Sequence, residues 1–154
     1  MTLGNREEGT VRKILVVTCL LAVVAGLSVY VAAQGKAMER QLSQVKWEPA
    51  APGSPIQFGV LWGDRAKGPE YAMLLKLPAG AEAGWHSHTA SYHGVAVQGT
   101  WVHTSSQGGK PVELGPGGYV MQPGKVAHND SCKGTTECIV FIHQHAAGDF
   151  IPAK

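Results

Sequence analysis

The sequence predicts an all-β domain, a single small barrel or sandwich, that follows an N-terminal export segment. The chain has 154 residues, enough for one domain and a short appendage. Glycine occurs 20 times and proline 9 times, a content that favours many turns over long helices. From Ile56 onward, short apolar runs alternate with breaks that contain Gly or Pro, a rhythm typical of sandwiches and barrels.

Eight segments have the length and apolar content of strands. They are separated by turn residues such as Pro78 and Gly80 and by the glycine-rich run 115–118. A short polar helix is also expected ahead of them, at residues 36–46. The expected strands are residues 56–62, 71–77, 84–88, 93–98, 100–104, 111–114, 119–122 and 137–145.

The first 33 residues have the pattern of a secretory signal. Arg6, Arg12 and Lys13 give a positive start, and an uncharged apolar run follows from residue 14 to residue 33, ending in small residues. About 20 apolar residues can also span a bilayer, so an uncleaved membrane anchor stays open as the alternative. Contact with a membrane is expected only in that second case.

The rest of the chain divides into an arm and a barrel. Residues 34–55 are expected to form a linker and N-terminal arm, because the prolines between residues 47 and 55 exclude a helix there. Residues 56–154 are expected to be the barrel. Since the positive end of the first segment stays inside the cell, both readings of residues 1–33 make the barrel periplasmic or otherwise extracytoplasmic.

Two cysteines in the barrel segment predict a disulfide. Cys132 and Cys138 lie close together in sequence, and in an oxidising compartment such a pair favours a bridge over a metal pair. Closing so short a loop stabilises the fold by about 2 kcal/mol in the chain-entropy model. Two free thiols, one in a strand and one in a turn, are the alternative.

Charge excludes one class of partner. The net charge is +2, and the sequence contains no basic block, so a nucleic-acid partner is not expected. A barrel of about 100 residues can enclose one core and one ligand-sized cavity. A small molecule is therefore the expected ligand.

Histidines form the chemically distinctive pattern. His86 and His88 are two residues apart, and in a strand this spacing places both rings on one face. Two adjacent imidazoles can bind a borderline divalent cation. His128 follows a turn at Pro123 and begins a new segment, so it is expected to turn toward the first pair.

These stretches resemble the two motifs of the cupin superfamily. Gly80, His86, His88 and Gly99 fit the first motif, in which a His-x-His pair stands between two glycines. Gly117, Pro123 and His128 fit the second motif.

The resemblance covers residues 56–146 and is closest to small exported bacterial cupins that are grouped as a domain of unknown function. It implies a double-stranded β-helix, or jelly-roll, barrel with a metal ion on its histidines. It also implies a homodimer formed through sheet edges.

The sequence departs from the first motif at the third ligand. Cupins place a glutamate there, whereas this chain has Tyr92 in that slot and His93 beside it. Strand alternation allows only one of the two to face the cavity unless a bulge intervenes. His93 is the expected ligand, because a neutral imidazole binds near neutral pH while a tyrosine must first lose its proton. Tyr92 stays open as the alternative ligand or as a catalytic proton donor.

The expected metal ligands are therefore His86, His88, His93 and His128, with no carboxylate among them. The cofactor is one divalent transition metal, with Fe, Mn, Zn, Ni and Cu all open. Three functions follow: a metalloenzyme acting on a small molecule, of dioxygenase, lyase or isomerase type; a non-catalytic metal- or ligand-binding sensor module; and a metal-free structural barrel.

The remaining histidines and tryptophans carry weaker expectations. His143 is expected to line the cavity, whereas His103 and His145 are expected at the surface. Trp62 and Trp101 are expected in the core or the cavity wall, as aromatic residues in small barrels commonly are.

Overall fold

The computed structural model describes residues 37–153, so the predicted export segment at residues 1–33 lies outside the described part. Residues 40–153 form one compact unit. Between residues 37 and 153 no helix is long and apolar enough to cross a membrane. The helix expected at residues 36–46 is wrong over its described part, which contains only a 3-10 turn, Leu42–Gln44.

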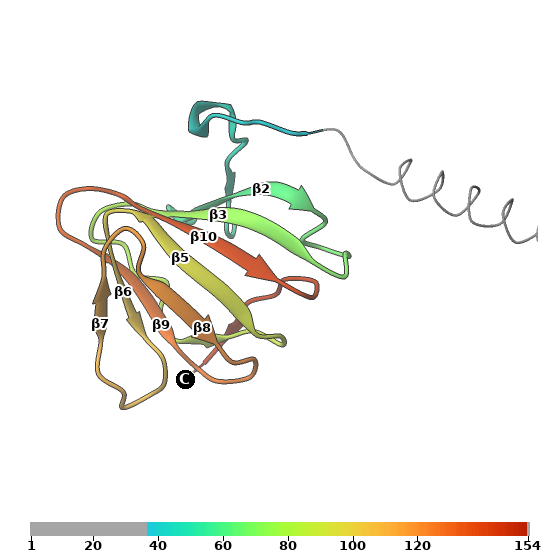
Figure 1. The fold of residues 1–154 in the computed structure, drawn as a ribbon. Coiled ribbons are helices and arrows are strands. Elements are labelled where there is room, and N and C mark those ends of the chain that lie inside the picture. Colours follow the sequence, from blue (N-terminus) through green and yellow to red (C-terminus); the bar gives the residue numbers. More distant parts are fainter. Residues whose placement is uncertain (1–36, 154) are drawn as a thin grey trace, which may run out of the picture. The chain divides into compact units, whose positions relative to one another are not determined.

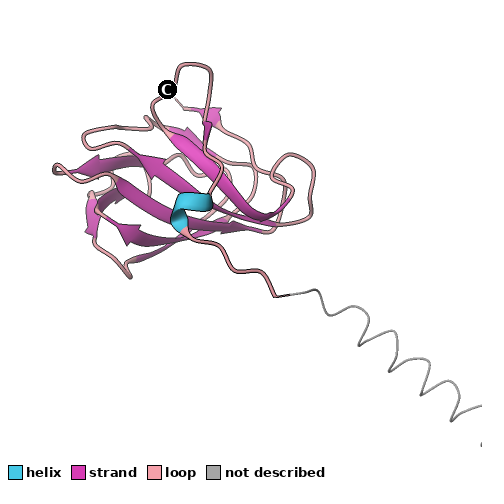
Figure 2. Cartoon of the chain, turned by 90° about the horizontal axis from the view of Figure 1, so that it is seen from above, coloured by secondary structure: helices cyan, strands magenta, loops and turns pink. Residues whose placement is uncertain are grey.

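The folded unit is built of antiparallel strands, as predicted (Figure 1). Figure 2 shows strands joined by loops with one helical turn. The largest sheet has the order β1 (Glu48–Pro49), β2 (Gln57–Gly63), β3 (Tyr71–Leu77), β10 (Cys138–Gln144), β5 (Tyr92–Gln98) and β8 (Tyr119–Gln122). A second sheet has the order β7 (Val112–Leu114), β6 (Thr100–Thr104) and β9 (Asn129–Lys133). A third pairs β11 (Ile151–Pro152) with β4 (His86–Ser87).

All eight expected strands are present, three of them with the expected bounds. The structure adds β1, β9 and β11, which the sequence reading left as arm, turn or tail. β9 is the important addition. It begins with polar residues that do not read as a strand, yet it pairs along its whole length with β6.

Side chains from the two larger sheets fill the interior. Trp101 on β6 is buried against Gly94 on β5. A Cβ at Gly94 would lie 2.8 Å from the Trp101 ring, so only glycine leaves room for the indole. Gly99, the last glycine of the first motif, has a φ of +77° in the tight β5–β6 turn, a conformation that glycine adopts without strain.

The predicted disulfide is present. Cys132 on β9 and Cys138 on β10 are bonded to each other. Because β9 belongs to the three-stranded sheet and β10 to the six-stranded sheet, the bridge links the two larger sheets. The homodimer stays a prediction, since the structure describes a single chain.

Candidate metal centre

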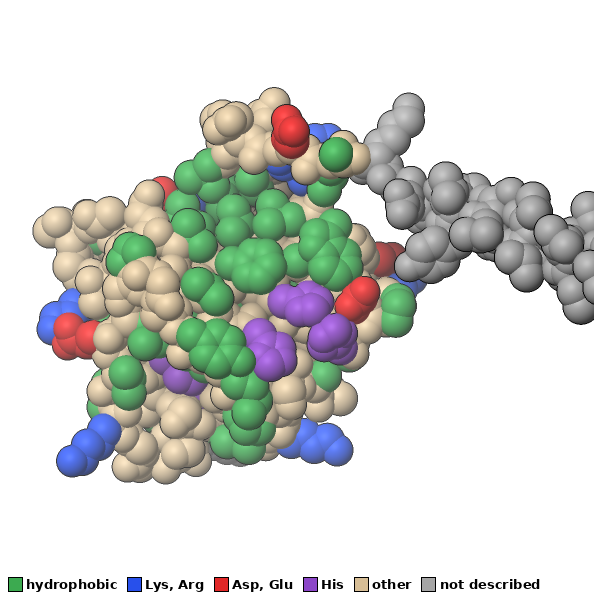
Figure 3. Space-filling view, in the orientation of Figure 1, with side chains coloured by type: hydrophobic (Ala, Val, Ile, Leu, Met, Phe, Trp, Pro, Cys, Tyr) green, Lys and Arg blue, Asp and Glu red, His purple; other side chains and the backbone are tan. Residues whose placement is uncertain are grey.

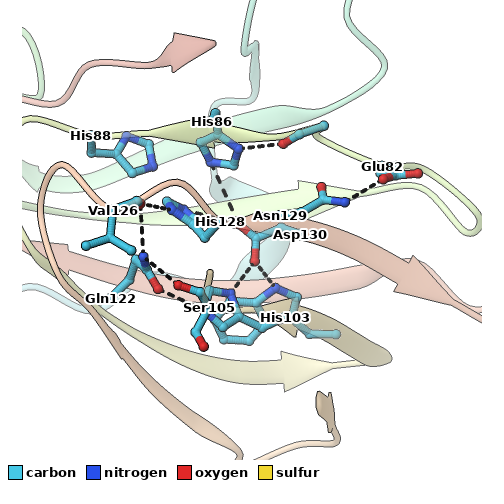
Figure 4. A network of polar contacts seen from close by, with 12 residues as sticks. Glu82, His86, His88, His103, Ser105, Gln122, Val126, His128, Asn129 and Asp130 are labelled. Carbon is cyan, nitrogen blue, oxygen red and sulfur yellow. Dashed lines mark hydrogen bonds and ion pairs between the residues drawn. The ribbon is translucent and has the colours of Figure 1, made fainter. Parts of the chain in front are cut away.

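Three of the expected histidines come together. His86 opens β4, His88 follows it on the same face, and His128 lies opposite His86 in an antiparallel bridge. His86 and His128 exchange both main-chain hydrogen bonds, of 2.9 and 2.8 Å, which fixes their side chains next to each other. One ring nitrogen of each histidine lies within 4.8 Å of the other two. Figure 4 shows the three rings facing a common space.

Main-chain carbonyls orient all three rings. Each ring directs its Nδ1 at a carbonyl oxygen: His86 at Gly84 (2.7 Å), His88 at Asp149 (2.6 Å) and His128 at Val126 (3.1 Å). A neutral imidazole that donates from Nδ1 keeps a lone pair on Nε2. The group therefore presents three Nε2 lone pairs, the form in which histidine binds a metal.

One buried ring nitrogen in this group lacks a hydrogen-bond partner, which fits a metal site. The Nε2 atom of His128 is buried and has no hydrogen-bond partner. A buried polar atom without a partner is rare in folded proteins. Burial also lowers the pKa of His128 to about 4 and lowers the pKa of His88, so both rings are neutral near pH 7. Metal ions bind the neutral ring.

A carboxylate that the sequence reading missed lies beside the histidines. Asp130 on β9 is buried, and its Oδ2 lies 3.8 Å from His86 Nε2 and 3.7 Å from His128 Nε2. The three grouped ligand side chains include no carboxylate, as expected, but the charge of Asp130 lies directly beside them. Strand alternation explains the position, because Asp130 and Cys132 are the inward residues of β9.

Asp130 is held in its ionised form. Burial by itself would raise its pKa, but the hydrogen bond from His103 and the neighbouring histidines outweigh burial and lower it. Asp130 Oδ1 accepts from Trp101 Nε1 at 2.7 Å and from His103 Nδ1 at 2.8 Å. His103 is 4% exposed, so its expected surface position is wrong.

His103 and Asp130 form a buried, hydrogen-bonded pair. The second ring nitrogen of His103 lies 3.1 Å from Gln122 Oε1. The Gln122 amide is oriented by its Nε2, which donates to the carbonyls of Val126 and Ser105 (Figure 4). Both ring nitrogens of His103 thus have polar partners, so the ring is held in one orientation beside Asp130.

Tyr92, and not His93, faces the histidines. Tyr92 is 3% exposed, and its ring centroid lies 5.4 Å from that of His88 and 5.6 Å from that of His128. Burial raises the pKa of Tyr92 well above its ordinary value of 10.0. The side chain therefore stays a neutral phenol, which suits a proton donor better than a metal ligand.

The expectation that His93 joins the group is wrong. The β5–β8 ladder is regular from Tyr92 to Val95, so no bulge re-aims the side chain and His93 points outward. There its Nδ1 lies 2.7 Å from the hydroxyl of Tyr119. His143 also lies on the outer face, beside Trp62, and not in the cavity as expected.

A cavity of about 490 Å³ opens next to the histidines. His86, His88, Tyr92 and Asp130 line one part of it, and apolar side chains of β2, β3, β6 and β10 are also in its wall. Arg65 supplies a positive charge to the wall. Ala50, Ala51 and Ser54 of the N-terminal arm also line the cavity, so the arm is part of the ligand-sized space.

Residues 145–153, here called the C-terminal strap, cross the mouth of this cavity. The Phe150 ring stacks on His86 with centroids 4.3 Å apart. The Asp149 carboxylate accepts hydrogen bonds from the Thr89 amide and hydroxyl, and the Ala153 amide donates to the Trp85 carbonyl at 2.9 Å. The strap thus orients His88 through the Asp149 carbonyl and covers His86.

Comparison with known proteins agrees with this fold. The profile of the ChrR Cupin-like domain family matches residues 36–147. The chain belongs to this family of cupins. No protein of curated function matches the sequence.

Solved structures with similar folds are distant in sequence. The polyketide cyclase RemF of Streptomyces resistomycificus has a TM-score of 0.62 and 14% identity, over 77% of this chain and 87% of RemF. KdgF of Halomonas sp. has a TM-score of 0.55 and 20% identity, over 68% of this cupin and 92% of KdgF.

A chain in the complex of SigE with the anti-sigma factor ChrR, from Rhodobacter sphaeroides, has a TM-score of 0.56 and 16% identity, over 79% and 75% of the two chains. At these identities the three likenesses establish the cupin fold alone.

Proposed function

We propose that this cupin holds one divalent transition metal on His86, His88 and His128 and binds a small anionic molecule beside it. The carrying observation is the convergence of three rings whose Nδ1 atoms are all taken by carbonyls, together with the unpartnered Nε2 of His128. Fe, Mn, Zn, Ni and Cu are all compatible with a site of imidazoles and one nearby carboxylate.

The residues around the histidines support an enzymatic role. A bound ion would supply Lewis-acid polarisation of a ligand oxygen or, as Fe(II) with open positions, dioxygen chemistry. Tyr92 holds a proton on the cavity wall, and Asp130 holds a negative charge that offsets part of the charge of a cation. A neutral phenol and an ionised carboxylate that line the same cavity suit proton transfer, as in a lyase or an isomerase.

Arg65 indicates the class of small molecule. Its guanidinium lies 4.7 Å from the centroid of the Phe58 ring, and its Nε is buried without a hydrogen-bond partner. None of the ion pairs found among residues 37–153 includes Arg65. Arginine binds carboxylates through two parallel hydrogen bonds, so we propose a small carboxylate with an apolar body.

The alternative is a non-catalytic sensor module. It is favoured by the family description, ChrR Cupin-like domain, and by the similarity to a chain of the SigE–ChrR complex. In that case the same residues bind a metal or ligand, and this binding changes the interaction with a protein partner. No reaction is catalysed. Turnover of any small carboxylate by the metal-loaded chain would exclude this alternative.

Metal content of the full chain tests the proposal. Single changes of His86, His88 and His128 to Ala should each remove most of the bound metal, because each deletes one of three ligands. His93→Ala and Tyr92→Phe should retain it, since one side chain points outward and the other remains a wall residue. Retention of the ion by all three ligand variants would refute the site.

Binding of small carboxylates tests the role of Arg65. Calorimetry with a panel of short apolar carboxylates should find a ligand for the metal-loaded chain. Arg65→Gln should weaken that ligand at least about 10-fold, because a charge-assisted bidentate pair is lost. Equal affinity in the two chains would remove Arg65 from the proposal while leaving the metal site standing.

We also propose that the cupin works outside the cytoplasm. The charged start and apolar run of residues 1–33 and the Cys132–Cys138 bridge support this location. Cell fractionation together with the mass of the mature chain tests it. A cytosolic chain with two alkylatable thiols would contradict the proposal.

A further inference from the structure

A second group of potential metal ligands lies on the outer face of the six-stranded sheet. The group consists of Glu70, directly before β3, His143 near the end of β10, and His145 directly after β10. Each side chain offers one ligand atom within 4.8 Å of the other two. Alternation places both histidines outside, because Gln144 between them is 2% exposed and points inward. Figure 3 shows histidine side chains gathered beside an acidic one on the surface.

The donor atoms have the spacing that one small cation requires. Glu70 Oε2 lies 3.0 Å from His145 Nδ1 and 3.5 Å from His143 Nε2. Two donors, each about 2.1 Å from a tetrahedral zinc ion, lie roughly 3.4 Å apart. The two imidazole rings contact each other edge-on, with centroids 4.4 Å apart.

His143 has an unpartnered polar atom at this place. Its Nε2 is buried and makes no hydrogen bond, although the side chain as a whole is 25% exposed. The surroundings explain the burial, because the Trp62 ring packs beside it at 5.5 Å. The strand register places Ala72 between Trp62 and His143, and Ala72 is completely buried. A ligand on Nε2 would satisfy an atom that water reaches poorly.

We propose that Glu70, His143 and His145 form a second metal site, on the surface, for a borderline divalent cation such as Zn²⁺ or Cu²⁺. Two imidazole nitrogens and one carboxylate oxygen suit these ions and leave coordination positions open to solvent. The site is independent of the inner one, because the six-stranded sheet separates the two groups. His145 is also the first residue of the C-terminal strap, so an ion bound there restrains the start of the strap.

Trp62 provides a local readout. Cu²⁺ quenches the fluorescence of a nearby indole, and the Trp62 ring lies against His143. In the full chain carrying His86→Ala and His128→Ala, Cu²⁺ should quench part of the emission with a stoichiometry of one. Adding His145→Ala or Glu70→Gln should weaken that binding at least about 10-fold, since a ligand is lost. His93→Ala, a change on the same face, is the matched control and should have no effect.

Calorimetry on the chain without the inner substitutions guards against misfolding of the double variant. It should show two equivalents of Cu²⁺, and His145→Ala should remove one of them. Trp62→Phe should abolish the quench and retain the binding. One equivalent that depends only on His145 would leave this proposal standing and refute the inner site. Binding that is indifferent to His145, or equally sensitive to His93, would refute the surface site.

Discussion

The inner and outer histidine groups use the same side chain in two different settings. In the inner group, every ring is oriented by a main-chain carbonyl, and His86 and His128 are buried. In the outer group, His143 and His145 instead face the carboxylate of Glu70, whose side chain is 44% exposed. The inner lone pairs are therefore fixed before any ion arrives, whereas the outer ligands must be ordered when it binds.

This difference predicts that the two groups bind a metal ion with different affinities. Ordering a rotamer-rich side chain costs about 0.5–1.5 kcal/mol, and the outer group must order an exposed glutamate. The inner group avoids that cost because its rings are held by the backbone and by packing. Each group has three ligand side chains, so a count of ligands would predict equal affinity. The better-ordered side chains of the inner group predict that it binds the metal more tightly.

The largest expected effect compares the carboxylates of the two groups. Asp130→Ala should destabilise the metal-free chain by about 2–4 kcal/mol, because it leaves the buried Trp101 Nε1 and His103 Nδ1 without their shared partner. Glu70→Ala should change stability by about 0.5 kcal/mol or less, as an exposed pair contributes little. Urea unfolding of both variants measures the contrast. Equal losses would contradict the contrast between a buried carboxylate and an exposed one.

Metal-induced stabilisation should follow the inner group. Zn²⁺ at 100 times its dissociation constant should raise the unfolding free energy by about 2.7 kcal/mol, because the folded state alone presents the three rings together. His128→Ala should abolish this gain, and His145→Ala should preserve it. Thermal unfolding with and without the ion is the measurement. A gain lost in the His145 variant would reverse the ranking of the two groups.

Removing the disulfide should have a smaller effect on stability, and it alters strands that carry residues of both groups. The bridge joins β9, which carries Asp130, to β10, which carries His143. Replacing both cysteines by Ser should cost about 2 kcal/mol of stability through the freed loop. Copper quenching of Trp62 should stay unchanged, because His143 lies at the far end of β10. A loss of quenching on reduction would show that the outer group depends on the bridge.

The smallest expected effect on stability concerns one of two tyrosines, Tyr119 and Tyr92. Tyr119→Phe removes the hydroxyl that contacts His93 on the outer face and should change stability by about 0.5 kcal/mol or less. Tyr92→Phe should keep the inner ion and, if the cupin is an enzyme, lower turnover by about 10²-fold or more through loss of a proton donor. Activity assays and unfolding curves, measured on both variants, separate an effect on turnover from an effect on stability. Unchanged turnover in the Tyr92 variant would exclude the phenol from the chemistry.

Much of the fold and part of the site could be predicted from the sequence. The strand rhythm and the spacing of His86, His88 and His128 are local patterns, and they placed the barrel and the three rings. The position of His93 was wrong because it depends on which residue of β5 faces inward. That choice is fixed by the pairing with β8 and not by the preference of a metal for imidazole.

Asp130 could not be found in the same way. It stands in a polar run, Asn129-Asp130-Ser131, that reads as a loop, and it becomes a strand residue only through pairing with β6. Its partners, Trp101 and His103, lie almost thirty residues earlier in the chain. The available signal was the spacing of His128, Asp130 and Cys132, which fits one face of a strand.

The C-terminal strap has a practical consequence for anyone producing this protein. Phe150 and Asp149 belong to the wall of the cavity, and the Ala153 amide is tied to Trp85. A purification tag or a fusion partner added after residue 154 would therefore begin at the rim of the binding space. A histidine tag there would bring competing imidazoles close to the inner metal group, and so a cleavable tag at another position is the appropriate choice for metal analysis.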